Sequence, residues 1–92
     1  MTTPTTEISD KPSYPLVTAL TAVRKARQMT QADLANQAGL SRMTIQRLES
    51  NGLDPRLSTL QEMARVLEHS MVLIPAHLQE SFADWLSEQP TK

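Results

Sequence analysis

A chain of 92 residues without cysteine allows one small domain and excludes a disulfide framework and a thiolate metal site. No apolar run approaches the roughly 20 residues of a membrane span, and the N-terminus lacks the basic start and apolar middle of a signal peptide, so we expect a cytoplasmic protein with no membrane segment. The net charge of −1 hides an uneven distribution. Residues 16–66 carry seven cations and four acids, whereas the flanking segments have a net charge of −4. The positive central segment favours a polyanionic partner such as nucleic acid.

The N-terminal residues 1–13 contain many threonines and prolines and few apolar residues, which predicts a disordered tail. The alternative, an arm in the DNA minor groove, has only Lys11 as a cation. Pro15 then begins a helix that ends near Gln28, because apolar residues follow at spacings of three and four: Leu16, Ala19, Leu20, Val23 and Ala26. Three basic residues lie off this stripe and are either solvated or in contact with a phosphate: Arg24, Lys25 and Arg27.

Residues 30–51 hold two short amphipathic patterns joined by one glycine, which predicts a helix-turn-helix. The apolar positions repeat on one helical face on either side of this glycine: Leu34, Ala35 and Ala38, then Ile45 and Leu48. Thr30 and Ser41 are expected to cap the two helices through their hydroxyls. Gly39 suits a left-handed turn, which any residue with a Cβ adopts only at an energetic cost.

The second helix of this unit turns polar and long side chains outward when its apolar residues face inward. These side-chain types can reach base edges in a major groove, so we predict base contacts from Arg42, Met43, Gln46 and Arg47, with Ser41 and Thr44 at the groove edge. The alternative is a helical packing unit that binds no nucleic acid. A solvent face with two arginines and no alternating acid is unusual for that role.

This motif resembles the XRE (Cro/cI) family of phage and bacterial repressors. In that family a Gln opens the first helix, an Ala and a Gly follow four and eight positions later, and an Ile and a Leu-Glu pair close the second helix. The matching residues here are Gln31, Ala35, Gly39, Ile45, Leu48 and Glu49. The resemblance implies an all-α, lambda-repressor-like bundle of four to five helices that binds double-stranded DNA, with Gln31 on a phosphate.

Turn-forming residues at positions 50–56 predict a loop, on which Arg56 is expected to contact a second phosphate. Ser58 is the expected cap of the next helix, whose core stripe consists of Leu57, Leu60, Met63, Ala64 and Leu67. Residues 14–69 are therefore predicted to be the DNA-binding domain.

The segment Ser70–Ile74 is apolar on both faces and rich in strand formers, which predicts a short strand before Pro75. A lone strand leaves its backbone groups unpaired, so we expect antiparallel pairing with a second copy through Met71, Val72, Leu73 and Ile74. A two-fold homodimer of this kind suits a palindromic operator. The alternative is an extended linker packed on its own helices.

Residues 76–88 return to helical spacing, with an apolar stripe of Leu78, Phe82, Trp85 and Leu86. This stripe is either core over the paired strands or, through Trp85, a contact with a partner protein. Residues 70–88 are thus predicted to form a dimerisation strand and a C-terminal helix.

The order of a helix-turn-helix, a further helix and the sequence SMVLI resembles the HipB-like antitoxins. That resemblance implies a dimeric repressor that also binds a HipA-like kinase toxin and represses its own operon. The alternative is a stand-alone phage-type or regulatory repressor without a toxin partner. No catalytic triad, carboxylate pair or glycine-rich phosphate loop is found, and His69 and His77 lack a third ligand at metal spacing, so we expect no enzymatic activity, cofactor or metal.

Overall fold

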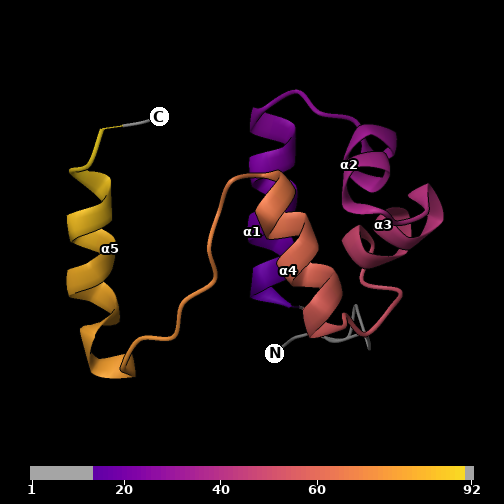
Figure 1. Ribbon diagram of the computed structural model, residues 1–92. Coiled ribbons are helices and arrows are strands. Elements are labelled where there is room, and N and C mark those ends of the chain that lie inside the picture. Colours follow the sequence, from indigo (N-terminus) through magenta and orange to yellow (C-terminus); the bar gives the residue numbers. More distant parts are fainter. Residues whose placement is uncertain (1–13, 91–92) are drawn as a thin grey trace, which may run out of the picture.

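The computed structural model describes residues 14–90, so the tail predicted at residues 1–13 lies outside the described part. Five α-helices and one 3-10 turn follow one another (Figure 1): α1 (Pro15–Ala26), α2 (Gln31–Ala38), α3 (Arg42–Glu49), α4 (Leu57–Val66), η2 (Ala76–Leu78) and α5 (Gln79–Ser87). The predicted all-α bundle of four to five helices is confirmed. Among the described residues, no helix is both long enough and apolar enough to span a membrane.

The core lies among α1–α4, where α1 and α2 each pack against both α3 and α4. Its buried side chains are Val17, Leu20, Leu34, Ala35, Ile45, Leu48, Leu60, Met63, Ala64 and Leu67. The predicted stripes of α1 and α4 are each partly wrong, because Leu16 of α1 is 48% exposed and Leu57 of α4 is 63% exposed. The face that α1 buries instead contains Val17, Leu20 and Arg24, which are spaced by three and four residues.

The helix-turn-helix has the predicted local structure. Thr30 Oγ1 accepts a hydrogen bond from the Asp33 amide at 2.9 Å, and Asp33 Oδ2 accepts one from the Thr30 amide at 3.3 Å, which makes a capping box at the start of α2. Gly39 ends α2 with φ 72°, and Ser41 Oγ accepts from the Thr44 amide at the start of α3. Gly39 and Ser41 thus form the turn between α2 and α3.

The start of α4 differs from the prediction. The helix begins at Leu57, directly after Arg56, and no side chain caps it. Ser58 therefore lies inside the first turn, two positions too late to act as the N-cap. The consequence is that Arg56 marks the junction between the loop and α4.

Three helices end on left-handed residues other than glycine. Gln28, Asn51 and Glu68 follow α1, α3 and α4 with φ of 59°, 61° and 58°. After each, an amide bonds back to a carbonyl five residues earlier: Met29 to Arg24, Gly52 to Arg47 and His69 to Ala64. This arrangement satisfies the last carbonyls of the helix and reverses the chain sharply.

Residues 70–75 form no strand, so that prediction is wrong for the described chain. A strand needs a neighbour to accept its backbone hydrogen bonds, and the described residues contain no second extended segment that could pair with it. Met71 and Ile74 are half-buried, whereas Val72 and Leu73 are 70% and 99% exposed. The segment therefore presents two apolar side chains to solvent.

The C-terminal helix α5 stands apart from the four-helix body (Figure 1). The helical region predicted over residues 76–88 begins as the 3-10 turn η2 and continues as α5 to Ser87. Among the described elements, α5 makes extensive contacts only with η2. None of the residues of α5 is buried. Its apolar stripe is therefore not part of the core of this chain.

Candidate nucleic-acid interface

Helix α3 buries one face and exposes the other. Ile45 and Leu48 are 0% and 1% exposed, and each lies in the core. On the opposite face, the side chains predicted to contact bases are all exposed: Arg42, Met43, Gln46 and Arg47. The two residues predicted at the groove edge lie at the start of the helix, where Ser41 Oγ and Thr44 Oγ1 are 2.9 Å apart. The structure thus gathers the predicted base-contacting residues on one surface.

A buried ion pair fixes the C-terminal end of α3. Arg24 of α1 donates from Nε to Glu49 Oε2 at 2.7 Å and from Nη2 to Glu49 Oε1 at 2.9 Å. The two side chains are 9% and 8% exposed. Arg24 Nη1 also donates to the Met29 carbonyl at 2.7 Å. The two parallel bonds between the planar groups hold α3 against α1 in one orientation.

Gln31 joins this pair from the first residue of α2. Its Nε2 donates to Glu49 Oε1 at 2.9 Å, and the side chain is half-buried. One amide hydrogen of Gln31 is thereby used inside the protein, and the second remains for another acceptor. Glu49 therefore connects α1, α2 and α3 through its two carboxylate oxygens.

The environment of Glu49 keeps it ionised. Burial by itself would raise the pKa of Glu49, but the hydrogen bonds from Arg24 and Gln31, with the positive charge of Arg24, outweigh burial and lower that pKa. The residue pattern did not predict this role, because Arg24 lies off the predicted apolar stripe and was expected to be either solvated or in contact with a phosphate. The available signal was Glu49, an acid at the end of the second motif helix, because a carboxylate next to a phosphate backbone is repelled unless a cation neutralises it.

The arginines of the described chain divide into two groups. Arg24, Arg27 and Arg65 are paired with Glu49, Glu68 and Glu62, respectively. The exposed arginines Arg42, Arg47 and Arg56 form no ion pair with any described residue. Their guanidinium groups therefore retain all of their donors for an external anion or base.

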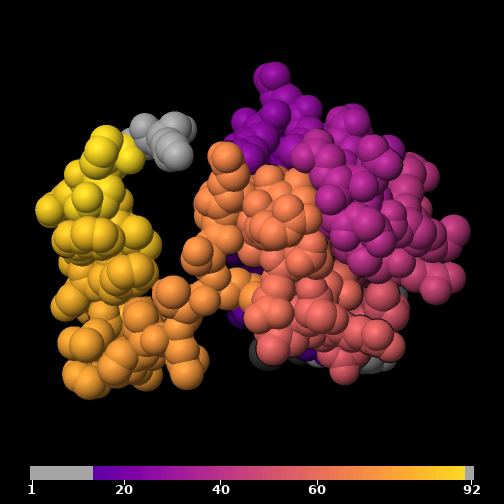
Figure 2. Space-filling view, in the orientation of Figure 1, coloured from indigo at the N-terminus to yellow at the C-terminus, as the bar shows by residue number. Residues whose placement is uncertain are grey.

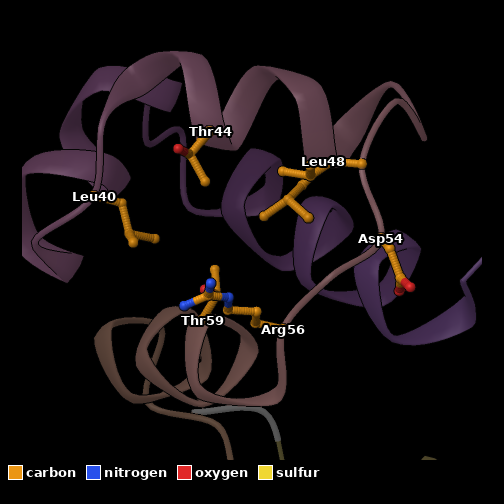
Figure 3. Close-up of a pocket in the computed structure, with 7 residues that line it drawn as sticks. Leu40, Thr44, Leu48, Asp54, Arg56 and Thr59 are labelled. Carbon is orange, nitrogen blue, oxygen red and sulfur yellow. The ribbon is translucent and has the colours of Figure 1, made fainter.

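A shallow cavity of about 280 Å³ lies between α3 and α4, beside the loop that connects them. Leu40, Thr44, Leu48 and Thr59 line it together with three loop residues: Leu53, Asp54 and Arg56. In Figure 3 the side chain of Arg56 extends across the start of α4 to Thr59, whereas the carboxylate of Asp54 points away from the cavity. Arg56 thus lies next to the helix that carries the predicted base contacts.

The loop is also linked to the start of α1. Partial burial, the negative charge of Asp54 and a hydrogen bond to its carboxylate together raise the pKa of the Tyr14 hydroxyl. Asp54 and Arg56 line the same cavity, but they form no ion pair with each other.

Comparison with known proteins identifies the family. The helix-turn-helix family model HTH_3 matches residues 20–73, which is more than half of the chain. The chain belongs to the XRE-type helix-turn-helix family. A crystallised mutant of the restriction-modification controller protein C.Esp1396I shares the fold, with a TM-score of 0.59 and 24% identity over 80% of this chain and 92% of that one.

Two curated relatives in this family have more specific names. Antitoxin HigA1 of Mycobacterium tuberculosis is 41% identical over 59 residues, which are 64% of this chain and 40% of that protein. The immunity repressor protein of Bacillus phage phi105 is 44% identical over 46 residues, or 50% of this chain and 32% of that protein. The chain thus spans less than half the length of these relatives, and the more specific resemblance to HipB-like antitoxins stays a prediction.

Proposed function

We propose that this XRE-type regulator is a sequence-specific transcriptional repressor that contacts the major groove through the exposed face of α3. The observation that carries the proposal is the division of the arginines: Arg24, Arg27 and Arg65 are paired with acids, whereas those on α3 are exposed and form no ion pair with a described residue. Arg42 and Arg47 can each bind O6 and N7 of guanine through two hydrogen bonds. Met43 and Gln46 complete this face, and Ser41 and Thr44 lie at its edge.

Phosphate contacts set the orientation of this helix in the proposal. Gln31 keeps one amide hydrogen for a phosphate while the other holds Glu49. Arg56 lies at the start of α4 with an unpaired guanidinium and provides a second phosphate contact. Phosphate contacts of this kind position the protein without selecting sequence.

The repressor is proposed to act as a homodimer that includes the segment Met71–Ile74. Support comes from the exposure of Val72 and Leu73, which are large apolar side chains with no cover in the single chain. Two recognition helices related by a two-fold axis enter successive major grooves about 34 Å apart, so the operator is expected to be a palindrome.

A toxin is the proposed protein partner. HigA1 is named an antitoxin, which supports an antitoxin role here, and a HipA-like kinase remains the specific partner that we propose. Trp85 is 54% exposed and is available for contact with another chain. The phage immunity repressor among the relatives supports the second candidate, a stand-alone repressor.

Selection of a binding site from random duplex DNA, followed by affinity measurements, tests the DNA-binding proposal. Arg42→Ala and Arg47→Ala should each lower the affinity for the selected site by roughly tenfold or more, since a bidentate contact contributes about 1–3 kcal/mol of discrimination. Arg65→Ala is the matched control, because Arg65 is an exposed arginine on α4 that is already paired with Glu62. Variants of α3 that bind as selectively as the parent would refute this assignment.

The phosphate contact of Arg56 has a separate signature. Arg56→Ala should weaken binding to every sequence by a similar factor and reduce the slope of affinity against salt concentration by about one. A loss confined to one sequence would contradict the role in phosphate binding.

The antitoxin role is tested by the neighbouring reading frame. Co-expression of this chain with the product of an adjacent kinase-like gene should give a stable complex that binds the operator more tightly than the chain alone. A lone gene with full operator binding would favour the stand-alone repressor.

A further inference from the structure

Met43 is an apolar residue on the polar face of α3. It lies in the first turn of this helix, and it is 55% exposed. Gln46 and Arg47 follow it by three and four positions, so they share its face. Among the large apolar residues that are exposed in the described chain, Met43 is the one that belongs to α3. An apolar side chain thus stands among the residues that are predicted to contact bases.

Packing within the chain does not account for a methionine at this position. The other described methionines serve the core: Met63 is 0% exposed, and Met29 and Met71 pack against the buried cluster. Met43 is not part of that cluster. Figure 2 shows the α3 region at the outer edge of the four-helix body, on the side away from α5. Neither the core nor α5 therefore covers the side chain of Met43.

The turn that carries Met43 is held in place by its cap. Ser41 Oγ accepts a hydrogen bond from the Thr44 amide at 3.1 Å, and the hydroxyl oxygens of Ser41 and Thr44 are 2.9 Å apart. These bonds fix the start of α3. In helix-turn-helix proteins the N-terminal residues of the recognition helix contact base edges. In the proposed complex Met43 therefore enters the major groove together with Arg42 and Arg47.

The chemistry of methionine restricts what it can recognise there. Its side chain has no hydrogen-bond donor, and its thioether is only a weak acceptor, so it cannot bind the polar edge of a base as arginine or glutamine does. The apolar group that the major groove presents is the C5 methyl of thymine. Cytosine lacks this methyl, whereas 5-methylcytosine carries it at the same ring position. The flexible, polarisable methionine side chain is suited to cover such a group.

We infer that Met43 determines specificity by contacting the C5 methyl of a pyrimidine, either thymine or 5-methylcytosine, in each half-site. The inference rests on the proposed function and adds an apolar contact to the hydrogen bonds of Arg42 and Arg47. Single apolar residues also occur on protein surfaces without a binding role. A residue of that kind would make DNA affinity independent of the methyl group, which gives the test.

Replacement of each thymine of the selected site in turn by deoxyuridine removes the methyl and leaves base pairing unchanged. At one position of the half-site the parent should lose roughly fourfold in affinity, as expected for one buried methyl-sized group. Met43→Ala should bind the thymine and deoxyuridine forms of that site equally. Gln46→Ala is the matched control on the same face: it should weaken binding overall and keep the parent's ratio between the two forms.

Cytosine and 5-methylcytosine at the same position provide an independent readout. Methylation should raise the affinity of the parent by a similar factor and leave that of Met43→Ala unchanged. Tighter binding of the thymine site than of the 5-methylcytosine site would identify thymine as the natural source of the methyl, and the reverse order would identify methylated cytosine.

Two results would overturn the inference. One is a parent whose affinity does not respond to deoxyuridine at any position, and the other is a Met43→Ala variant that keeps the parent's ratio at every position. DNA binding separates the two proposals. A parent that selects no site would refute the proposed function, whereas a parent that selects a site without dependence on a methyl would refute only the role of Met43.

Discussion

Removing the charge of Glu49 should strongly destabilise the fold. Glu49→Gln keeps the side-chain volume but leaves the guanidinium of Arg24, only 9% exposed, without its counter-charge. It also places an amide donor where Glu49 now accepts from Arg24 and Gln31 at 2.7–2.9 Å. Breaking a buried pair by removal of one partner costs about 3–5 kcal/mol. A domain of this size has a total unfolding free energy of roughly 5–14 kcal/mol, so the loss should be large.

Urea and thermal unfolding measure this effect in a double-mutant cycle. For a domain of under 100 residues a loss of about 3 kcal/mol corresponds to a drop in Tm of roughly 12–24 °C. The double variant Arg24→Met, Glu49→Leu should recover most of the loss, because well-packed apolar residues can replace a buried ion pair without penalty. Arg65→Met removes the exposed pair with Glu62 and should cost less than about 1 kcal/mol. If Glu49→Gln costs no more than this control, the buried pair does not hold α3 in place.

Further predictions concern pH and the helix ends. The pKa of Glu49 is lower in the folded state than its ordinary value of 4.5, so its contribution to stability is present above that value and should disappear as pH falls through the folded pKa; acid titration of unfolding for the parent and Glu49→Gln should differ in this range. Gln28→Gly should raise the unfolding free energy by about 0.5–1 kcal/mol, because glycine relieves the left-handed backbone; a decrease would show that the side chain matters more. Gly39→Ala should lower it by about 1–2 kcal/mol in thermal unfolding, and the backbone alone should be responsible, since an added Cβ has nothing within 4 Å; an unchanged Tm would contradict this account.

The helix-turn-helix was predictable because its signals are local. Thr30, Gly39 and Ser41 act on residues no more than four positions away, and each has the predicted bond or dihedral angle. The outward face of α3 followed from helical periodicity once Ile45 and Leu48 were assigned to the core. Local propensity and the tertiary fold agree in this unit, so the residue pattern alone was enough to predict the helix-turn-helix.

The buried face of α1 was not predictable in the same way. Periodicity assigned Leu16 inward and Arg24 outward, since a charged residue rarely lies in a core. The structure reverses both assignments because Arg24 meets Glu49, which is 25 positions later in the chain. A contact of that sequence separation leaves no trace in the spacing of apolar residues along one helix.

The strand prediction failed for a different reason. The composition of residues 71–74 favours an extended backbone, but a strand is defined by a neighbour, and the described single chain offers none. The composition of this segment correctly predicted that it is apolar and not helical. Composition alone cannot distinguish a strand paired with a neighbour from an exposed apolar segment that leads to α5.

Most acids near α3 are bound by neighbouring groups of the same chain, which explains how a chain with net charge −1 presents a basic surface to DNA. Within residues 16–66 each acid has a partner: Asp33 in a capping box, Glu49 with Arg24, Asp54 with Tyr14 and Glu62 with Arg65. None of them forms an ion pair with the exposed arginines of α3 or the following loop. The acids of α5 lie on a helix that stands apart from the body (Figure 1). Beyond a Debye length of about 8 Å at physiological salt their charge is screened, so the field near α3 is set by its own unpaired arginines rather than by the net charge.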